Sequence, residues 1–207
     1  MRSEAVIARL AGWALAAGVT GAAAWAVVVL LSEDVNETDG RVILTSLGFA
    51  AASTTGASGL AAILSGSWGL RALGLATLGC SIGALALFAW IVWGIDYLWD
   101  VPEWRWRVCA CATVLAIAGG HASLMLRARR ATDSGLVILV TALSLVFAAI
   151  DAGGAILPIA KIVDEVDEAW ARVLGSVLVL LVATTVLAPL LRRLQSVSKE
   201  PATPLAA

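Results

Sequence analysis

Asp151 is the residue whose setting most suggests chemistry, because it is the one acid well inside a long hydrophobic run. An ionisable side chain in the hydrocarbon of a membrane is costly, so its presence there is by default a sign of function. At about 1.5 Å per residue from Gly135, Asp151 lies roughly 24 Å above the inner boundary of a hydrocarbon core about 30 Å thick. The carboxyl group is therefore expected near the outer boundary.

The expected partners of Asp151 are polar side chains at the same depth on neighbouring helices. Hydroxyls one helical turn past an outer arginine reach that depth, and the arginines themselves are long enough to reach down to it. These candidates are Thr45, Ser176, Arg41, Arg107 and Arg172, with Cys111 at the same level. Three interpretations stay open: a structural acid neutralised by an arginine or by hydroxyls, a proton- or cation-linked site, and a contact with a partner.

His121 is the only histidine. Counted from Arg127, it lies about 9 Å above the inner boundary, and so roughly 15 Å from Asp151 in depth. At that separation the two side chains form no acid–base dyad unless water or other residues bridge them. Because His121 follows Gly119 and Gly120, we expect it to hydrogen-bond across a close helix contact.

The familiar catalytic motifs are missing. The sequence has no HExxH zinc helix, no phosphate-binding P-loop and no GxSxG nucleophile elbow. A single histidine excludes bis-histidine haem ligation within the chain. We therefore expect no cofactor, no metal site and no enzymatic activity.

The composition indicates an integral membrane protein. The 207 residues are 60% hydrophobic and only 14% charged, and the net charge of −1 argues against a nucleic-acid partner. Six runs are long enough to span a bilayer. They cover residues 8–31, 42–65, 70–95, 107–126, 135–160 and 170–191. The sequence thus predicts one all-α membrane domain over residues 1–193, followed by a short disordered tail over 194–207.

The loop charges predict the orientation. Cytoplasmic loops carry an excess of lysine and arginine. The basic set comprises Arg2, Arg9, Arg71, Arg127, Arg129, Arg130, Arg192, Arg193 and Lys199. An even number of crossings then places both termini in the cytoplasm. The arginine and alanine bias favours a bacterial source, and hence the bacterial inner membrane.

Internal similarity predicts a repeat of two helices. Residues 103–127 match 168–192 after a shift of 65, with Glu103 on Glu168 and Arg107 on Arg172. The first run matches the third after a shift of 62, with Arg9 on Arg71. The expected fold is three tandem, parallel two-helix hairpins. The second run is rich in small residues, so we expect its neighbours to enclose it. Gly153, Gly154 and Pro158 predict a kink at the end of the fifth helix.

Two functional hypotheses follow from this pattern. The first is a non-enzymatic membrane subunit or scaffold that packs in the lipid bilayer against a membrane-protein partner or against itself. The second is a small proton- or ion-linked transporter or channel, with Asp151 and the hydroxyls of the second run lining a polar path.

Overall fold

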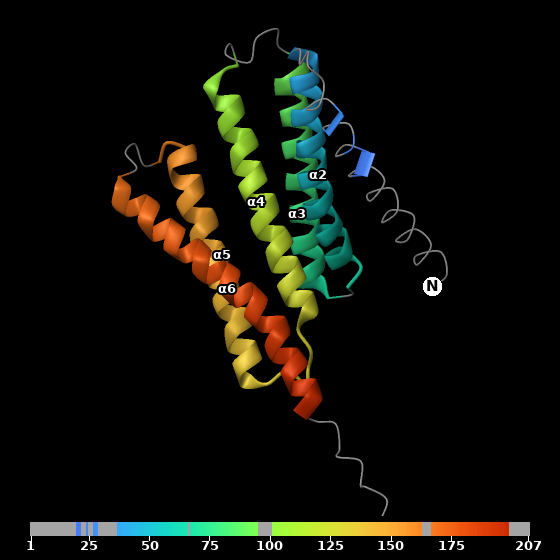
Figure 1. Cartoon of the computed structure of the whole chain (residues 1–207), viewed down its shortest axis with the longest axis vertical. Helices are drawn as coiled ribbons and strands as arrows, with labels where there is room; N and C mark the ends of the chain where they lie inside the picture. The colour runs from blue at the N-terminus through green and yellow to red at the C-terminus, as the bar shows by residue number, and fades with distance from the viewer. Residues whose placement is uncertain are drawn as a thin grey trace, which may run out of the picture.

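The computed structural model describes residues 20–21, 24, 27–28, 37–65, 67–94, 101–162 and 167–198. Within these ranges the structure is helical and contains no strand. Five helices are described: α2 (Glu37–Ile63), α3 (Trp68–Trp93), α4 (Glu103–Ala128), α5 (Gly135–Ile159) and α6 (Glu168–Ser198). Successive helices alternate in direction, so the ends of α2, α4 and α6 lie near the starts of α3 and α5 (Figure 1).

Four of these helices, α3 to α6, are long and apolar enough to cross a membrane. The α2 helix is as long, with 27 residues, but is not among the four. Its glycines, serines and threonines replace the large aliphatic side chains that dominate the others. The predicted first span, 8–31, falls almost wholly outside the described residues. At the other end, α6 continues to Ser198, so residues 194–198 are helical and not part of a disordered tail.

Short polar side chains cap the N-termini of α3, α5 and α6. Ser67 accepts a hydrogen bond from the Leu70 backbone N–H at the start of α3, and Ser134 accepts one from Val137 at the start of α5. Asp167 accepts one from the Trp170 backbone N–H at 2.8 Å and begins α6. Such caps pair backbone donors that the first helical turn leaves unpaired. These capping side chains therefore determine where α3, α5 and α6 begin.

The α5 helix continues through Pro158 to Ile159, so the segment 153–158 in which we expect a kink is helical. Proline lacks the N–H that would bond the carbonyl four residues earlier, which here belongs to Gly154. The indole Nε1 of Trp170, on α6, donates to that carbonyl at 3.3 Å. A neighbouring helix thus pairs the carbonyl that Pro158 leaves free, as unpaired backbone groups in lipid require.

Small residues bring α2, α3 and α4 together. A Cβ on Gly59 would lie 2.9 Å from the Gly74 carbonyl oxygen, so the α2 and α3 backbones are in close contact there. On α4, a Cβ at Gly119 would meet the Thr77 hydroxyl of α3, and one at Gly120 would lie 2.9 Å from the Ser58 hydroxyl of α2. Close approach of this kind is how helices gain packing energy in lipid.

Among the described helices, α4 is the most central, since it packs against α2, α3 and α5. Our expectation that the second run would be enclosed is therefore not met by the described neighbours. The outer half of α2 leaves Leu44, Leu47 and Phe49 exposed. Gly56, Ser58 and Gly59 of α2 are buried against its neighbours, whereas Ala51, Thr54 and Ala57 are exposed. The remaining pair, α5 and α6, packs together and joins the other three helices through α4 (Figure 1).

We predict that Gly74→Ala destabilises the fold by about 1–3 kcal/mol, the range for overpacking a tight contact. The added Cβ would press on the Gly59 carbonyl oxygen and lie 2.8 Å from the Ile63 backbone nitrogen. Gly79→Ala on the same helix is the control, because a Cβ there has nothing within 4 Å. Equilibrium unfolding in mixed micelles measures both. Equal stability of the two variants would contradict the close crossing.

Candidate functional site

Asp151 lines a cavity of about 410 Å³ between α4, α5 and α6. Its walls are almost entirely apolar. They include Val114 and Ile117 of α4, Ala155 of α5 and Leu178 of α6. The Oδ2 atom of Asp151 is buried and has no hydrogen-bond partner. A buried polar oxygen without a partner is costly in apolar surroundings, and a donor or a cation beside it would remove that cost.

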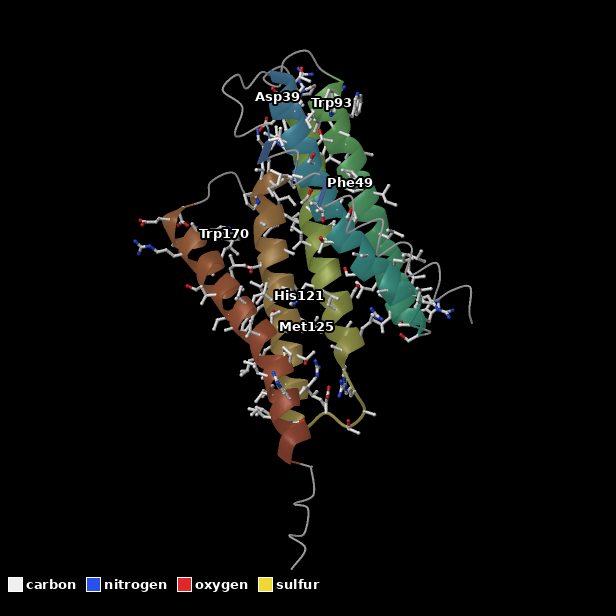
Figure 2. All side chains as sticks on the ribbon, turned by 45° about the vertical axis from the view of Figure 1, so that its right-hand side comes forward. Asp39, Phe49, Trp93, His121, Met125 and Trp170 are labelled. Carbon is white, nitrogen blue, oxygen red and sulfur yellow. The ribbon has the colours of Figure 1, made fainter. Side chains whose placement is uncertain are left out.

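His121 lines the same cavity from α4. Its Nε2 lies 2.9 Å from the Ser144 hydroxyl of α5, which in turn lies 3.2 Å from the Thr185 hydroxyl of α6. The histidine therefore bonds across helices, near the middle of the molecule (Figure 2). It does not touch Asp151. Asp151 and Ser144 are seven residues apart on α5, a rise of about 10 Å. The cavity extends along α5 from Ala155 to Ala148, and on α4 it includes His121.

The arginines expected beside Asp151 are engaged elsewhere in two cases. Arg107 pairs with Glu103 at 2.5 Å, and Arg172 pairs with Glu168 at 2.7 Å, each one helical turn back. In the described part of the chain, no arginine and no hydroxyl forms a hydrogen bond with Asp151 Oδ2, and this holds for Arg41 as well. A neighbour four residues away on the same helix competes better for an arginine than an acid on another helix.

The hydroxyls expected beside Asp151 also lie elsewhere. Thr45 donates to the Arg41 carbonyl at 2.6 Å and accepts the indole N–H of Trp93 at 2.8 Å, so it links α2 to α3. Ser176 is exposed and donates to the Arg172 carbonyl at 2.8 Å. On α6 it is Leu174 and Gly175 that line the cavity instead. Cys111, expected at the same depth, is not among the residues that line it. Equal depth along parallel helices did not bring these side chains to one face.

Sequence reasoning missed a polar stripe on α5 made by Thr141, Ser144 and Asp151. With Ala148 between them, these residues recur at intervals of three and four and share one helix face. Thr141 is 3% exposed and Ser144 is fully buried. The spacing was readable in the sequence and would have identified the buried face of α5. Their bonding partners on α4 and α6 were not readable.

The stripe continues to an ion pair at the end of α6. The Arg192 guanidinium lies 3.2 Å from the Asp133 carboxylate and 3.5 Å from the Thr141 hydroxyl. Asp133 is only 4% exposed and also accepts the Arg130 backbone N–H at 3.0 Å. That hydrogen bond and the Arg192 charge hold the pKa of Asp133 below its ordinary value. Beside it, Gln195 bonds Ser134. These contacts fasten the α4–α5 loop to α6.

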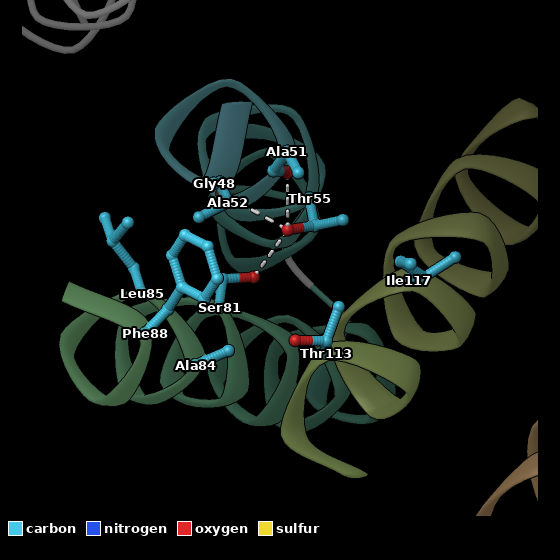
Figure 3. A pocket seen from close by; sticks show the side chains of 10 residues that line it. All are labelled: Gly48, Ala51, Ala52, Thr55, Ser81, Ala84, Leu85, Phe88, Thr113 and Ile117. Atoms are coloured by element: carbon cyan, nitrogen blue, oxygen red, sulfur yellow. Dashed lines mark hydrogen bonds between the residues drawn. The ribbon is translucent and has the colours of Figure 1, made fainter. Parts of the chain in front are cut away.

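Thr55 of α2 lines a different, smaller cavity of about 150 Å³ between α2, α3 and α4. Thr55 donates within its own helix, to the Ala51 or Ala52 carbonyl, and lies 2.8 Å from the Ser81 hydroxyl (Figure 3). The Ser58 hydroxyl likewise donates to the Thr55 carbonyl of the same helix. Such local bonds satisfy hydroxyls in an apolar environment. They make the α2 hydroxyls part of helix packing and separate them from Asp151.

Aromatic side chains mark the end of the molecule nearest Asp151. Trp93 and Trp170 lie toward this end (Figure 2), where amphipathic rings are expected at a membrane interface. The Arg105 guanidinium stacks over the Trp90 ring, 4.1 Å from its centroid, and within 5.5 Å of the Trp104 ring. Lys161, after α5, pairs with Glu103 of α4 at 3.3 Å. Exposed pairs of this kind contribute little stability.

In the described part of the chain, no three His, Cys, Asp or Glu side chains gather as metal ligands would. Comparison with known proteins adds no relationship: no family model matches, and no curated protein or solved structure is significantly similar. The account of this protein therefore rests on its own residues.

We predict that Asp133→Asn destabilises the protein at neutral pH by about 1–2 kcal/mol, because Arg192 loses its charged partner. The pKa of Asp133 is lower in the folded state, so its contribution is present above the ordinary pKa near 3.9 and lost as pH falls through the folded value. The gap between wild type and variant should therefore close in acid. Thermal unfolding in detergent across pH measures it, and a gap that stays constant would contradict the ion pair.

Proposed function

We propose that this chain is a small proton- or cation-linked transport unit of the membrane, centred on Asp151. The observation that carries the proposal is the buried, unpartnered Oδ2 of Asp151 in an apolar-walled cavity. A carboxyl in such surroundings gains most from binding a proton or a cation, and the fold supplies neither. The occupant must then come from outside and be able to leave.

A line of polar side chains below the cavity supports a path. His121 lines the cavity and hydrogen-bonds Ser144, and Thr185 of α6 joins Ser144. One turn further along α5, Thr141 meets Arg192, which holds Asp133 in the α4–α5 loop. Each of these groups carries a hydrogen bond to the next or lies one helical turn from it. Water in the cavity would complete the connection to Asp151.

The path differs from the one expected from the sequence. It runs along α5, with contributions from α4 and α6, and omits the hydroxyls of α2. The α2 hydroxyls bond carbonyls of their own helix and contribute to packing. The proposal therefore keeps Asp151 and replaces the second helix by the polar face of the fifth.

The proposed topology is six crossings with both termini in the cytoplasm of a bacterium, built from three parallel hairpins. The alternating directions of α2 to α6 bring the start of α3 and the ends of α4 and α6 to one end of the molecule (Figure 1). These segments contain Arg71, Arg127 and Arg192, so the positive-inside rule assigns this end to the cytoplasm. The matched ion pairs Glu103–Arg107 and Glu168–Arg172, at the start of α4 and of α6, support the repeat. Residues 8–31 and α2 would supply the two further crossings.

We predict that liposomes containing the protein dissipate a pH or cation gradient faster than empty liposomes, and that Asp151→Asn returns the flux to the empty-liposome rate. The amide keeps the shape of the side chain and removes the exchangeable charge. Ser176→Ala is the control, because Ser176 is exposed and bonds only its own helix. Flux that is absent for protons, Na⁺ and K⁺ alike, or that survives in Asp151→Asn, would contradict the proposal.

The second candidate is a non-enzymatic membrane subunit. It is favoured by α6, because only 6% of the residues in its apolar stretch are buried in the structure. The corresponding share is 28% in α3, α4 and α5. Lipid or a partner helix would cover this surface equally well in physical terms. Chemical cross-linking in native membranes, followed by mild extraction, distinguishes a partner helix from lipid. A monodisperse monomer with no cross-linked partner would exclude the subunit role.

A further inference from the structure

A third cavity, at the opposite end of the molecule from Trp93 and Trp170, is lined by arginines. It encloses about 480 Å³ where the end of α4 meets the end of α6. Its lining residues are Arg127, Ala128, Arg130, Pro189, Arg192 and Arg193. More than sixty residues of sequence separate Arg127 from Arg193, so the fold is what gathers these side chains.

The charged side chains that line this arginine cavity are all basic. No acidic side chain is among its lining residues in the described ranges, and the nearby Asp133 carboxylate binds Arg192. Four guanidinium groups thus surround one space, with the side chains of Arg127 and Arg130 exposed. Guanidinium groups bind phosphate oxygens through paired, charge-assisted hydrogen bonds. The chemistry of the cavity suits a phosphate group.

Arg192 is the fixed member of this set. Its side chain is 12% exposed, and its contacts with Asp133 at 3.2 Å and Thr141 at 3.5 Å hold it against α5. A donor that is already held in place loses little freedom when a ligand binds. The exposed arginines at the rim can then close on the ligand from the sides.

The position of the cavity points to the source of the phosphate. The apolar run of α6 gives way to Arg192 and Arg193, and α4 ends at Ala128, one residue past Arg127. The cavity therefore lies where hydrocarbon gives way to headgroups, and its walls include the apolar Pro189 and Ala128. A lipid offers a phosphate and an apolar body at this depth, whereas a soluble anion offers only the phosphate.

We propose that this arginine cavity binds the phosphate of an anionic phospholipid headgroup. The site shares Arg192 with the proposed path, but it does not include Asp151 and does not depend on transport at that residue. Binding there would brace the ends of α4 and α6, which the Asp133–Arg192 pair already ties to the α4–α5 loop.

The test uses the full-length, delipidated protein in detergent, titrated with phosphatidylglycerol and followed by native mass spectrometry. Arg127→Gln and Arg130→Gln should each weaken phosphatidylglycerol binding about five-fold, the effect of one basic residue near an anionic lipid surface. Arg129→Gln is the matched control: it removes the same charge from the same segment, but Arg129 does not line the cavity. It should change binding less than two-fold, about the scatter expected of a surface substitution.

Phosphatidylcholine and inorganic phosphate complete the design. Phosphatidylcholine should be retained less well, because its choline group is repelled by the arginines, and inorganic phosphate should not displace phosphatidylglycerol. An equal loss in Arg129→Gln would show a diffuse surface effect and overturn the proposal. Ready displacement by inorganic phosphate would assign the site to a free anion and would also overturn it. Unchanged lipid-free thermal unfolding of the variants confirms that they fold.

Discussion

The structure depends on the need of every polar group in hydrocarbon for a partner inside the protein, since no water is there to supply one. The helices pair their own backbone groups. Buried threonines such as Thr77 and Thr141 donate to carbonyls four residues back at 2.8 Å. Where Pro158 breaks this scheme, the Trp170 indole pairs the freed Gly154 carbonyl. The unpartnered Oδ2 of Asp151 is an exception to this rule, and the proposed function rests on it.

Two other buried side-chain atoms in the described ranges also lack hydrogen-bond partners, Ser123 Oγ and Arg105 Nε. They differ from Asp151 in their surroundings. Arg105 stacks its guanidinium over the Trp90 ring, and Ser123 is a neutral hydroxyl with no exposed surface. Neither lines the cavity that holds Asp151 and His121. Only the acid combines an ionisable group, an unpaired oxygen and space for an occupant.

The two halves of the bundle differ in how closely their helices pack. Around α2, α3 and α4, glycines and short hydroxyls allow close backbone contact and leave a cavity of only about 150 Å³. Around α4, α5 and α6 the packing is looser, and the 410 Å³ cavity and the polar face of α5 lie there. The α4 helix belongs to both halves, with Gly119 and Gly120 close to α3 and α2 and His121 in the larger cavity.

The sequence predicted the five described helices closely, because apolar runs and short polar caps determine helix ends locally. It also singled out Asp151 correctly as an acid within a helix that can span a membrane. It did not find the partners, because depth along a helix says nothing of which face a residue occupies. Arg107 and Arg172 were expected to reach Asp151, yet each pairs with a glutamate on its own helix. The meeting of Arg192 with Asp133 is a tertiary contact that no local pattern reveals.

The central claim, that Asp151 is kept for an exchangeable occupant and not for folding, is tested most directly by the stability of Asp151→Asn. Thermal unfolding of wild type and variant would be compared in one detergent at several pH values. The account predicts a variant at least as stable as wild type at neutral pH, because Oδ2 makes no bond in the fold. A clearly less stable variant, whose deficit disappears in acid, would reveal a structural ion pair and contradict the account.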